Sequence, residues 1–234
     1  MFKESMRSQY KVISQIYSFI NEAELTGDNL KYNRLYNKLA WSYNFSQRIY
    51  FWFKFGSEKK FREPFLSELD IKDGHKVLEV STGTADNFRF LNRKADYYGV
   101  DISMRMLLQA RKHLKRWKIN GTLVHCEGEN LPFADNYFDV VFHCGGINFF
   151  NDKQKAILEM IRVAKPGTKL LIVDETEQLI KENYQKNPFI KGSYTDAKKA
   201  AIPVNLIPLE MENIQSNIIC KGQIYKITFT KPIK

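Results

Sequence analysis

The sequence is short of cysteine and of long apolar runs. It has 3 cysteines in 234 residues, and Cys126, Cys144 and Cys220 lie too far apart for a metal-ligand pattern. No stretch approaches the ~20 apolar residues of a membrane span, and the start of the chain lacks the apolar core of a secretory signal. We therefore expect reduced thiols, a cytoplasmic protein and no metal site.

Acidic residues are also under-represented. The chain has 36 Lys and Arg against 26 Asp and Glu, a net charge of +10. Residues 1–62 carry 11 of the basic and 5 of the acidic side chains, so +6 of the charge lies there. A basic, aromatic segment suits RNA, an anionic lipid surface or an acidic substrate, and also an ordinary solvated helix face. No RNA-binding module is visible, so we expect no stable nucleic-acid binding. Peripheral membrane contact and the oligomeric state stay open.

The N-terminal third of the chain reads as helical. Apolar residues between Phe2 and Glu24 follow mostly helical spacing, and Gly27 ends that run. A second helix is expected from Asp28 to about Tyr43, then an aromatic stretch over Tyr50–Phe55, and Pro64 is expected to open a further helix. Residues 1–66 are therefore predicted to form a helical cap, and residues 67–234 a separate core.

Strand and helix patterns alternate through that core, which predicts an α/β fold with a doubly wound, mainly parallel sheet. Two strands separated by Lys221-Gly222 predict a C-terminal antiparallel hairpin. The proline-containing stretch at about 187–208 is expected to be an irregular insert that covers the substrate. The expected strands lie near 76–80, 97–100, 122–126, 138–143 and 169–174, and the expected helices near 86–94, 104–118, 153–164 and 175–186.

The most informative local feature is a turn of small residues, Ser81 to Ala85, between a buried strand and a predicted helix. The next strand ends in Asp101, about twenty residues further on. Small residues allow a ligand close to the backbone, and an acid at the end of the second strand can bind ribose hydroxyls. The turn lacks the spacing of the dinucleotide fingerprint, which seats a pyrophosphate.

Five segments, in this order, resemble motifs of the class I S-adenosylmethionine (SAM)-dependent methyltransferases. The resemblance covers roughly residues 75–180, and the most similar branch is that of the ubiquinone/menaquinone methyltransferases. The segments are Glu79–Ala85 (motif I), Gly99–Ser103 with Met106, Glu127–Phe133, Phe138–Val141 and Glu159–Thr168.

The resemblance implies a seven-stranded sheet, an N-terminal helical extension and SAM as cofactor, with S-adenosylhomocysteine as product. It assigns the ribose to Asp101, the adenine to Glu127 and the Gly128 amide, and the methionine end to Glu79 and to the carbonyls of Ser81 and His143. Ligands in open α/β sheets bind at the carboxyl ends of the strands, where all these residues fall. The full expected cofactor set is Tyr36, Glu79, Ser81, Gly83, Asp101, Ile102, Met106, Glu127, Gly128 and His143.

Two departures from the family pattern concern the turn and the adenine loop. Ser81 and Ala85 stand where motif I has glycines, and a positive φ is costly for them. We therefore expect the turn to form without left-handed torsions at these positions. Glu127 stands where the family has Asp, and is one methylene longer.

The segment after the fourth strand carries the candidate catalytic residues. His143 is a candidate general base, or a strand-end residue that offers only its carbonyl. Asn148 is a candidate for orienting the acceptor, and Phe149 and Phe150 for an apolar wall. Tyr36 lies in a segment that resembles one covering the methionine end in this family, although core packing explains it equally well.

The resemblance implies transfer of a methyl group to a small, hydrophobic or aromatic acceptor. Because the sulfonium is already activated, the protein mainly has to align the reactants and exclude water. A non-catalytic SAM-binding protein and an RNA methyltransferase are the alternatives, the first because motif I is altered and the second because of the net charge.

Overall fold

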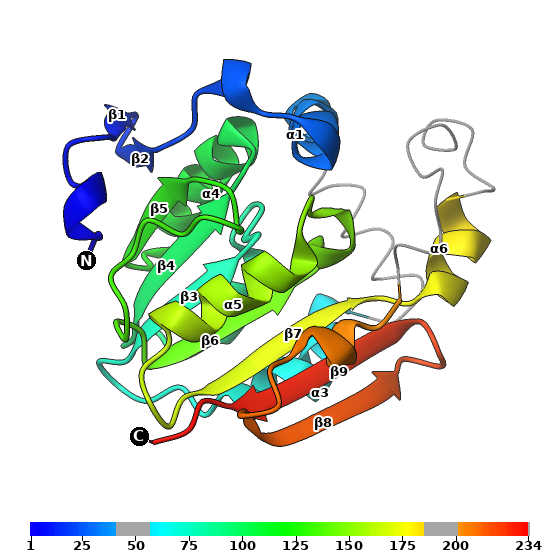
Figure 1. Cartoon of the computed structure of the whole chain (residues 1–234). Helices are drawn as coiled ribbons and strands as arrows, with labels where there is room; N and C mark the ends of the chain where they lie inside the picture. Colours follow the sequence, from blue (N-terminus) through cyan, green and yellow to red (C-terminus); the bar gives the residue numbers. More distant parts are fainter. Residues whose placement is uncertain (41–56, 185–200, 234) are drawn as a thin grey trace.

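The computed structural model describes residues 1–40, 57–184 and 201–233. Nine strands form one mixed sheet in the order β1-β2-β5-β4-β3-β6-β7-β9-β8 (Figure 1). The strands are β1 (Lys11–Ile13), β2 (Ile16–Ser18), β3 (Lys76–Val80), β4 (Asp96–Asp101), β5 (Gly121–His125), β6 (Val140–Cys144), β7 (Lys169–Glu175), β8 (Glu212–Ile219) and β9 (Ile224–Thr230).

The centre of the sheet is parallel, as predicted. Strand β3 pairs with β4 on one side and with β6 on the other, and the chain order reverses direction at this point. The loops that follow β3 and β6 therefore diverge to opposite faces and leave a crevice at the carboxyl edge of the sheet. The predicted C-terminal hairpin is confirmed, because β9 pairs antiparallel with both β7 and β8.

The prediction of a helix from Phe2 to Glu24 is wrong, and the sheet has nine strands rather than seven for that reason. Strands β1 and β2 form a hairpin, and β2 pairs in parallel with β5. Ile16 and Ser18 are buried and Tyr17 half-buried, a two-residue alternation that also fits part of a helical pattern. The residue pattern fits both a strand and a helix, and the pairing of β2 with β5 shows that the segment is a strand. Only the short 3-10 turns η1 (Glu4–Met6) and η2 (Glu22–Glu24) are helical in this segment.

The described helices are α1 (Gly27–Leu39), α3 (Glu58–Leu66), α4 (Met104–Trp117), α5 (Lys153–Val163) and α6 (Glu177–Tyr184), with 3-10 turns η3 (Ser67–Leu69), η4 (Asp86–Phe90), η5 (Ile147–Phe149) and η7 (Pro203–Leu206). Pro64 lies inside α3 rather than at its start, since Ser57 caps this helix by accepting a bond from the Lys60 amide. The helix expected over 86–94 is the shorter η4. The expectations for Tyr43, for Tyr50–Phe55 and for the first part of the insert fall outside the described residues.

Each face of the sheet carries its own apolar core. Helices α3 and α4 cover one face, with Phe65, Phe88 and Leu107 among the buried residues. Helix α5 and the aromatic N-terminal segment cover the other, with Phe133, Phe138 and Met160. The described residues contain no helix long and apolar enough to cross a membrane.

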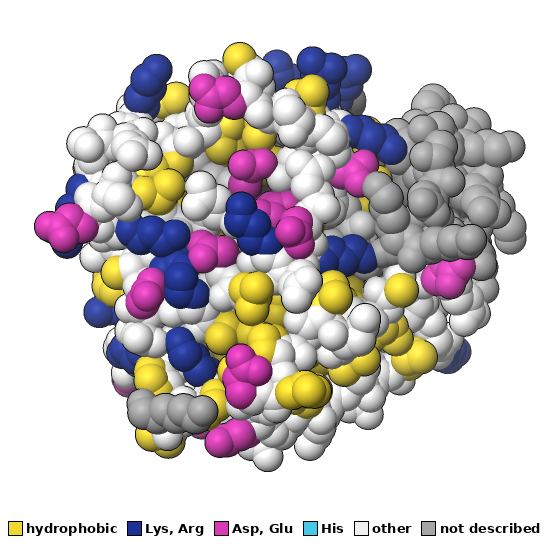
Figure 2. Space-filling view, in the orientation of Figure 1, with side chains coloured by type: hydrophobic (Ala, Val, Ile, Leu, Met, Phe, Trp, Pro, Cys, Tyr) yellow, Lys and Arg dark blue, Asp and Glu magenta, His cyan; other side chains and the backbone are white. Residues whose placement is uncertain are grey.

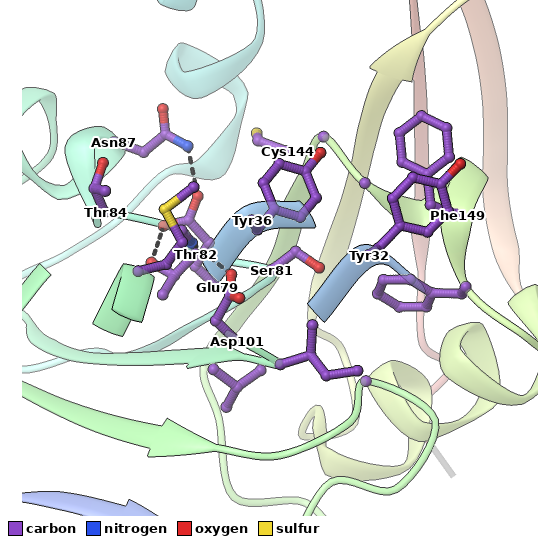
Figure 3. A pocket seen from close by; sticks show the side chains of 18 of the residues that line it. Tyr32, Tyr36, Glu79, Ser81, Thr82, Thr84, Asn87, Asp101, Cys144 and Phe149 are labelled. Atoms are coloured by element: carbon purple, nitrogen blue, oxygen red, sulfur yellow. Dashed lines mark hydrogen bonds between the residues drawn. The ribbon is translucent and has the colours of Figure 1, made fainter. Parts of the chain in front are cut away.

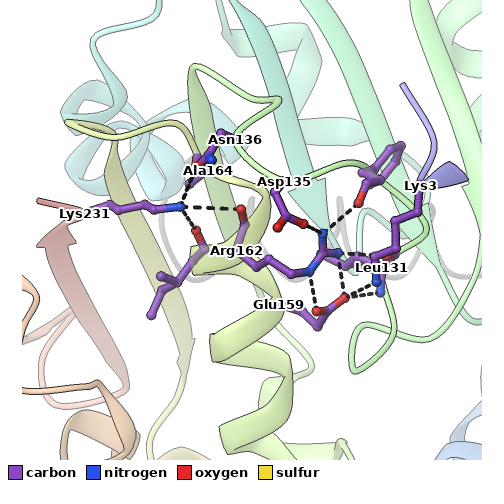
Figure 4. A network of polar contacts seen from close by, with 10 residues as sticks. Lys3, Leu131, Asp135, Asn136, Glu159, Arg162, Ala164 and Lys231 are labelled. Atoms are coloured by element: carbon purple, nitrogen blue, oxygen red, sulfur yellow. Dashed lines mark hydrogen bonds and ion pairs between the residues drawn. The ribbon is translucent and has the colours of Figure 1, made fainter. Parts of the chain in front are cut away.

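A polar network fastens the ends of the chain to α5 (Figure 4). Arg162 donates to Glu159 (2.6 Å) and to the Leu131 carbonyl (3.0 Å), and Glu159 also pairs with Lys3 (3.4 Å). Lys231, just after β9, donates to the carbonyls of Ile161 and Ala164, each at 2.8 Å. A cation at the carboxyl end of a helix is favourable, so Lys231 stabilises this end of α5.

Candidate active site

A hollow opens at the carboxyl ends of β3, β4 and β6, with α1 across it (Figure 3). It contains about 970 Å³ of space, part of it open to solvent. Eight predicted cofactor residues line it: Tyr36, Glu79, Ser81, Gly83, Asp101, Ile102, Met106 and Gly128. The predicted residues Glu127, His143 and Asn148 are not among its lining residues.

The turn after β3 forms through left-handed torsions, contrary to our expectation. Ser81 has φ 58° and Ala85 has φ 59°, which costs roughly 1–2 kcal/mol per non-glycine residue. Two backbone bonds hold the turn in compensation: the Thr82 amide donates to the Val100 carbonyl (2.9 Å) and the Ala85 amide to the Thr82 carbonyl (2.8 Å). Ala85 is fully buried in the apolar core and does not line the hollow.

Asp101 is held at the rim by the same turn. One carboxylate oxygen accepts from the Gly83 amide and the other from the Ser103 amide, both at 2.8 Å. Burial raises the pKa of this carboxyl to about 6, while its backbone hydrogen bonds oppose the rise. An ionised carboxylate accepts about four hydrogen bonds, so Asp101 retains capacity for a ligand diol.

Glu79 lies in the floor of the hollow within a chain of polar contacts. It accepts from the Thr82 hydroxyl (2.7 Å) and from the Asn87 amide, and Asn87 in turn accepts from Arg62 Nε (2.7 Å). Burial raises the pKa of Glu79 to about 8, and its bonds to Asn87 and Thr82 oppose the rise. The carboxyl is therefore mostly protonated at neutral pH. Arg62 and Asn87 also line the hollow, and neither was predicted from the sequence as a site residue.

Three asparagines spaced four residues apart attach α1 to the rim. Asn29 donates to Glu127 (2.7 Å) and Glu129 (3.2 Å), and Asn33 donates to the Ile102 carbonyl (2.6 Å). Asn37 accepts from the Ser103 hydroxyl (2.7 Å) and from the Arg105 amide (3.2 Å) at the start of α4. The i, i+4, i+8 spacing places all three on one side of the helix. The sequence could have revealed this face, because asparagine is a poor former of helix interiors.

Aromatic rings make the wall under α1. Tyr32, Tyr36, Phe149 and Phe150 line the hollow, and the rings of Tyr32 and Phe149 lie 4.5 Å apart between centroids. Burial raises the pKa of Tyr32, with the charge of Asp28 as a second cause. The tyrosine hydroxyl therefore stays protonated. We predicted Tyr36, Phe149 and Phe150 from sequence but not Tyr32.

The loop after β5 brings Glu129 to the hollow, whereas Glu127 is not among its lining residues. A side chain at Gly128 would meet the Phe150 ring at 2.5 Å, so only glycine fits under that ring. Glu129 is buried rather than solvated and lines the hollow, whereas Glu127 is held by Asn29. Burial raises the pKa of Glu129, opposed by hydrogen bonds from backbone amides and Asn29.

His143 has no ring nitrogen left for a substrate. The ring is fully buried, Nδ1 lies 3.0 Å from the Val80 carbonyl, and Nε2 accepts from the Ile147 amide (2.9 Å). Burial lowers the pKa of His143 to about 4, so the ring is neutral with its proton on Nδ1. The general-base hypothesis is not supported by this geometry, which gives His143 the role of fixing the β6 loop.

Asn148 is likewise occupied within the fold. Its backbone amide donates to Asp174 (3.0 Å), its side-chain amide donates to the Glu175 carbonyl (2.9 Å), and its oxygen accepts from Tyr225 (3.3 Å). The residue is buried and ties η5 to the ends of β7 and β9. This arrangement does not support the prediction that Asn148 orients an acceptor.

The comparisons with known proteins agree with this geometry. Residues 78–172 match the family model described as a methyltransferase domain. The demethylmenaquinone methyltransferase of Thermotoga maritima is 33% identical over 144 residues, which cover 60% of this chain and 60% of that protein. The ubiquinone/menaquinone biosynthesis C-methyltransferase UbiE of Cupriavidus taiwanensis is 34% identical over 113 residues, 47% of this chain and 46% of its own. The matches thus span about half of each relative.

Solved structures share the fold at lower identity. A SAM-dependent methyltransferase from Aquifex aeolicus aligns with TM-score 0.53 and 22% identity over 74% of this chain and 93% of its own. A phosphoethanolamine N-methyltransferase of Haemonchus contortus, in complex with S-adenosylhomocysteine, aligns with TM-score 0.62 and 16% identity over 90% of this chain and 61% of its own. Residues 78–172 thus resemble the methyltransferase-domain family, and the chain has the fold of the class I SAM-dependent methyltransferases.

Proposed function

We propose that this protein binds SAM in the hollow and transfers its methyl group to a small, hydrophobic or aromatic acceptor of the quinol type. The observation that carries the proposal is the placement of Asp101 and the small-residue turn on one rim of a hollow whose other wall is aromatic. When bound, SAM supplies a methyl group already activated on sulfur. The protein's task is then to bind, to orient and to exclude water.

The ribose end of the cofactor is assigned to Asp101. Its remaining lone pairs can accept from a diol, and the amides of Gly83 and Ser103 hold the carboxylate in place. At Gly83 the position of a Cβ has no atom within 4 Å, so the turn leaves space for a ligand to pass close to the backbone. Both features support the fit of SAM to these residues.

The adenine end is assigned to the loop 127–129 with Ile102 and Met106. We proposed Glu127 from sequence as the acceptor for the adenine amine. Glu129 suits that role better, because it lines the hollow while Glu127 does not. The Gly128 amide stays a candidate donor to a ring nitrogen, beneath the Phe150 ring that covers it.

The methionine end, which carries both a carboxylate and an ammonium, is assigned to the floor around Glu79. Among the described lining residues Arg62 is the one with a basic side chain, so we assign the methionine carboxylate to it. The carbonyls of the adjoining turn suit the ammonium, whose positive charge would favour the ionised form of Glu79 beside it. The ligand 5′-methylthioadenosine lacks both charges. Arg62→Ala should therefore weaken SAM binding about tenfold and leave methylthioadenosine binding unchanged, as measured by calorimetry.

The acceptor is assigned to the aromatic wall of Tyr32, Tyr36 and Phe149. His143 and Asn148 have their polar atoms occupied within the protein, so neither favours an acceptor that needs a strong base. An electron-rich ring, such as that of a quinol, needs little such help. The names of the curated relatives, demethylmenaquinone methyltransferase and ubiquinone/menaquinone C-methyltransferase, support the same acceptor class.

Calorimetry with SAM and S-adenosylhomocysteine, followed by transfer of a labelled methyl group, tests the proposal. The acceptor panel contains demethylated quinols with short side chains, simple phenols and RNA, and Asp101→Asn is the control. We expect binding of both nucleosides and labelling of a quinol. The absence of SAM binding at ~1 mM would contradict the proposal. Binding without transfer to any acceptor would favour a non-catalytic role, and labelled RNA would favour the RNA alternative.

A further inference from the structure

Strand β8 forms an open edge of the sheet. It is 8 residues long and, among the described residues, pairs with β9 alone. Natural edge strands are usually protected by charges, proline or short length. The stretch Asn213–Ile219 contains no charged residue and no proline, and Ile218 is 60% exposed. This edge is therefore available for pairing with another strand.

The sequence of this edge is self-complementary about Ser216. When two copies of β8 run antiparallel with Ser216 opposite Ser216, Ile214 faces Ile218 and Gln215 faces Asn217, in both directions. Aliphatic pairs and amide pairs directly opposite one another stabilise antiparallel sheets. We propose that β8 pairs with β8 of a second copy of this chain around a two-fold axis at Ser216, and that the two sheets become continuous.

The apolar pairs would lie on a face that already has a core. Ser216 pairs with Ile227 and Ile218 with Tyr225, so these side chains share the face of the buried residues Tyr225 and Ile227. Ile214 packs against that same core. Ile214 of the second copy would cover Ile218 of the first copy. The apolar core would then extend across the two-fold axis.

Exposed apolar side chains also occur on α5 and η7, which cover this face, and between η7 and β8. Leu158 of α5, Val204 of η7 and Leu209 are exposed, Leu209 to 96%. Helix α5 and η7 contact one another, and Figure 2 shows apolar side chains over the region where they lie in Figure 1. An exposed apolar patch at the rim of a sheet is typical of a protein interface.

Charges beyond the two ends of the strand fit the antiparallel direction of this pairing. Lys221 follows β8, whereas Glu210 and Glu212 lie at its start, so two antiparallel copies bring the lysine of one to the same end as the glutamates of the other. All three charged side chains are exposed. The two-fold axis repeats this arrangement, so opposite charges come to the same end of the paired strands at both ends.

An irregularity of β8 limits the paired segment. Asn213 has φ 53°, and the register with β9 shifts between Glu212 and Gln215. A bulge of this kind ends regular pairing. The ladder between copies is therefore confined to about the five residues from Ile214 to Ile218, which is the segment that is self-complementary.

The mass of the protein in solution tests this inference, measured by light scattering after gel filtration and by sedimentation at ~1–100 µM. We expect a dimer for the natural chain. Ile218→Lys should weaken it at least about hundredfold, since each copy loses an apolar pair and gains a buried charge. Val12→Lys is the matched control, because Val12 is also 60% exposed but lies on β1 at the opposite edge. It should leave the dimer intact.

A charge exchange tests the antiparallel direction of the pairing. Lys221→Glu should weaken the dimer several-fold, and adding Glu210→Lys with Glu212→Lys should restore it. A monomer at 100 µM, an unchanged dimer in Ile218→Lys, or a dimer lost in Val12→Lys would overturn the inference. SAM binding and methyl transfer serve as the fold control, because β8 contributes no residue to the hollow. The dimer can therefore be absent while the proposed function is correct, and it can be present while the proposed function is wrong.

Discussion

The floor of the hollow and the helix that covers it are built in different ways. The floor comes from neighbouring parts of the chain: Thr82 and Asn87 both donate to Glu79, and Gly83 donates to Asp101. The cover, α1, bonds to residues between 66 and 123 positions away along the sequence. Because the contacts of the floor are local, its residues form a recognisable sequence motif. The contacts of α1 form only when distant parts of the chain come together.

The floor and the cover also differ in the contacts that hold them in place. The floor is part of the buried sheet region, because Glu79 before the turn and Ala85 at its end are both buried. The cover is held by a few amide hydrogen bonds and by the contact of Tyr32 with Phe149. Elements attached by few buried contacts open more readily than core strands. We therefore expect changes in the floor to affect ligand binding more than changes in the cover.

The largest effect is expected for Gly83→Leu. The leucine side chain would occupy ligand space in the floor, and we expect SAM binding to weaken by more than about hundredfold. Gly74→Leu is the control, because Gly74 also has a positive φ and open space around its Cβ but lies outside the hollow. Calorimetry should show normal affinity for the control. Equal losses in both variants would point to backbone strain instead of blocked space.

Asp101→Asn should follow, with SAM binding weakened roughly tenfold to hundredfold by loss of charge-assisted bonds to the ribose. Asparagine is preferred to alanine because its one side-chain oxygen keeps a partner for one of the amides of Gly83 and Ser103, whereas alanine would leave both without a partner. Melting temperatures measured alongside calorimetry separate folding from binding. Unchanged affinity in a folded variant would contradict the ribose assignment.

The protonated floor should appear as a pH dependence of stability. The pKa of Glu79 is about 8 in the folded protein against 4.5 as its ordinary value. Between these values the folded chain binds one proton more than the unfolded chain, so the free energy of unfolding falls as pH rises, by up to about 1.4 kcal/mol per pH unit. Glu79→Gln should make the slope shallower in urea unfolding from pH 5 to pH 8, most clearly above pH 6, where the contribution of Asp101 has ended. The exposed Glu63→Gln should keep it, and equal slopes in all three proteins would exclude a protonated Glu79.

The smallest effect is expected in the cover, for Asn33→Ala. It removes the bond to the Ile102 carbonyl, and SAM binding should weaken about threefold to tenfold. Arg34→Ala, an exposed neighbour on the same helix, should change nothing. Hydrogen exchange should become faster in α1 of Asn33→Ala and stay slow in β3. A loss as large as that of Asp101→Asn would remove the distinction between floor and cover.

The predictions from sequence succeeded where a single strong pattern repeated and failed where two patterns overlapped. The predicted bounds of β3 equal the observed ones, and those of α4 and α5 differ by one residue. The apolar patterns of these segments fit only one kind of secondary structure. Residues 11–18 carry both periods, and pairing with β5 made them strands. Left-handed torsions at Ser81 and Ala85 were not foreseen, since the hydrogen bonds that compensate them appear only in the folded turn.

The candidate site shows the same division. Asp101, Gly83 and Glu79 follow from the motif, and all three line the hollow. Arg62, Asn87 and Glu129 were not selected, because their side chains have no distinctive spacing and reach the hollow only through packing. His143 was selected for its chemical type, but burial and two local hydrogen bonds decide its state.

The sequence by itself determined the alternation of strands and helices, the small-residue turn and the acid at the end of β4. These depend on contacts between residues close along the chain, which composition and periodicity express directly. Only the tertiary structure decided that the N-terminal hairpin joins the sheet, that Glu129 and not Glu127 lines the hollow, and which side chains attach α1 to the rim. Each of these outcomes rests on hydrogen bonds and burial between distant segments, whose partners exist only once the chain has folded.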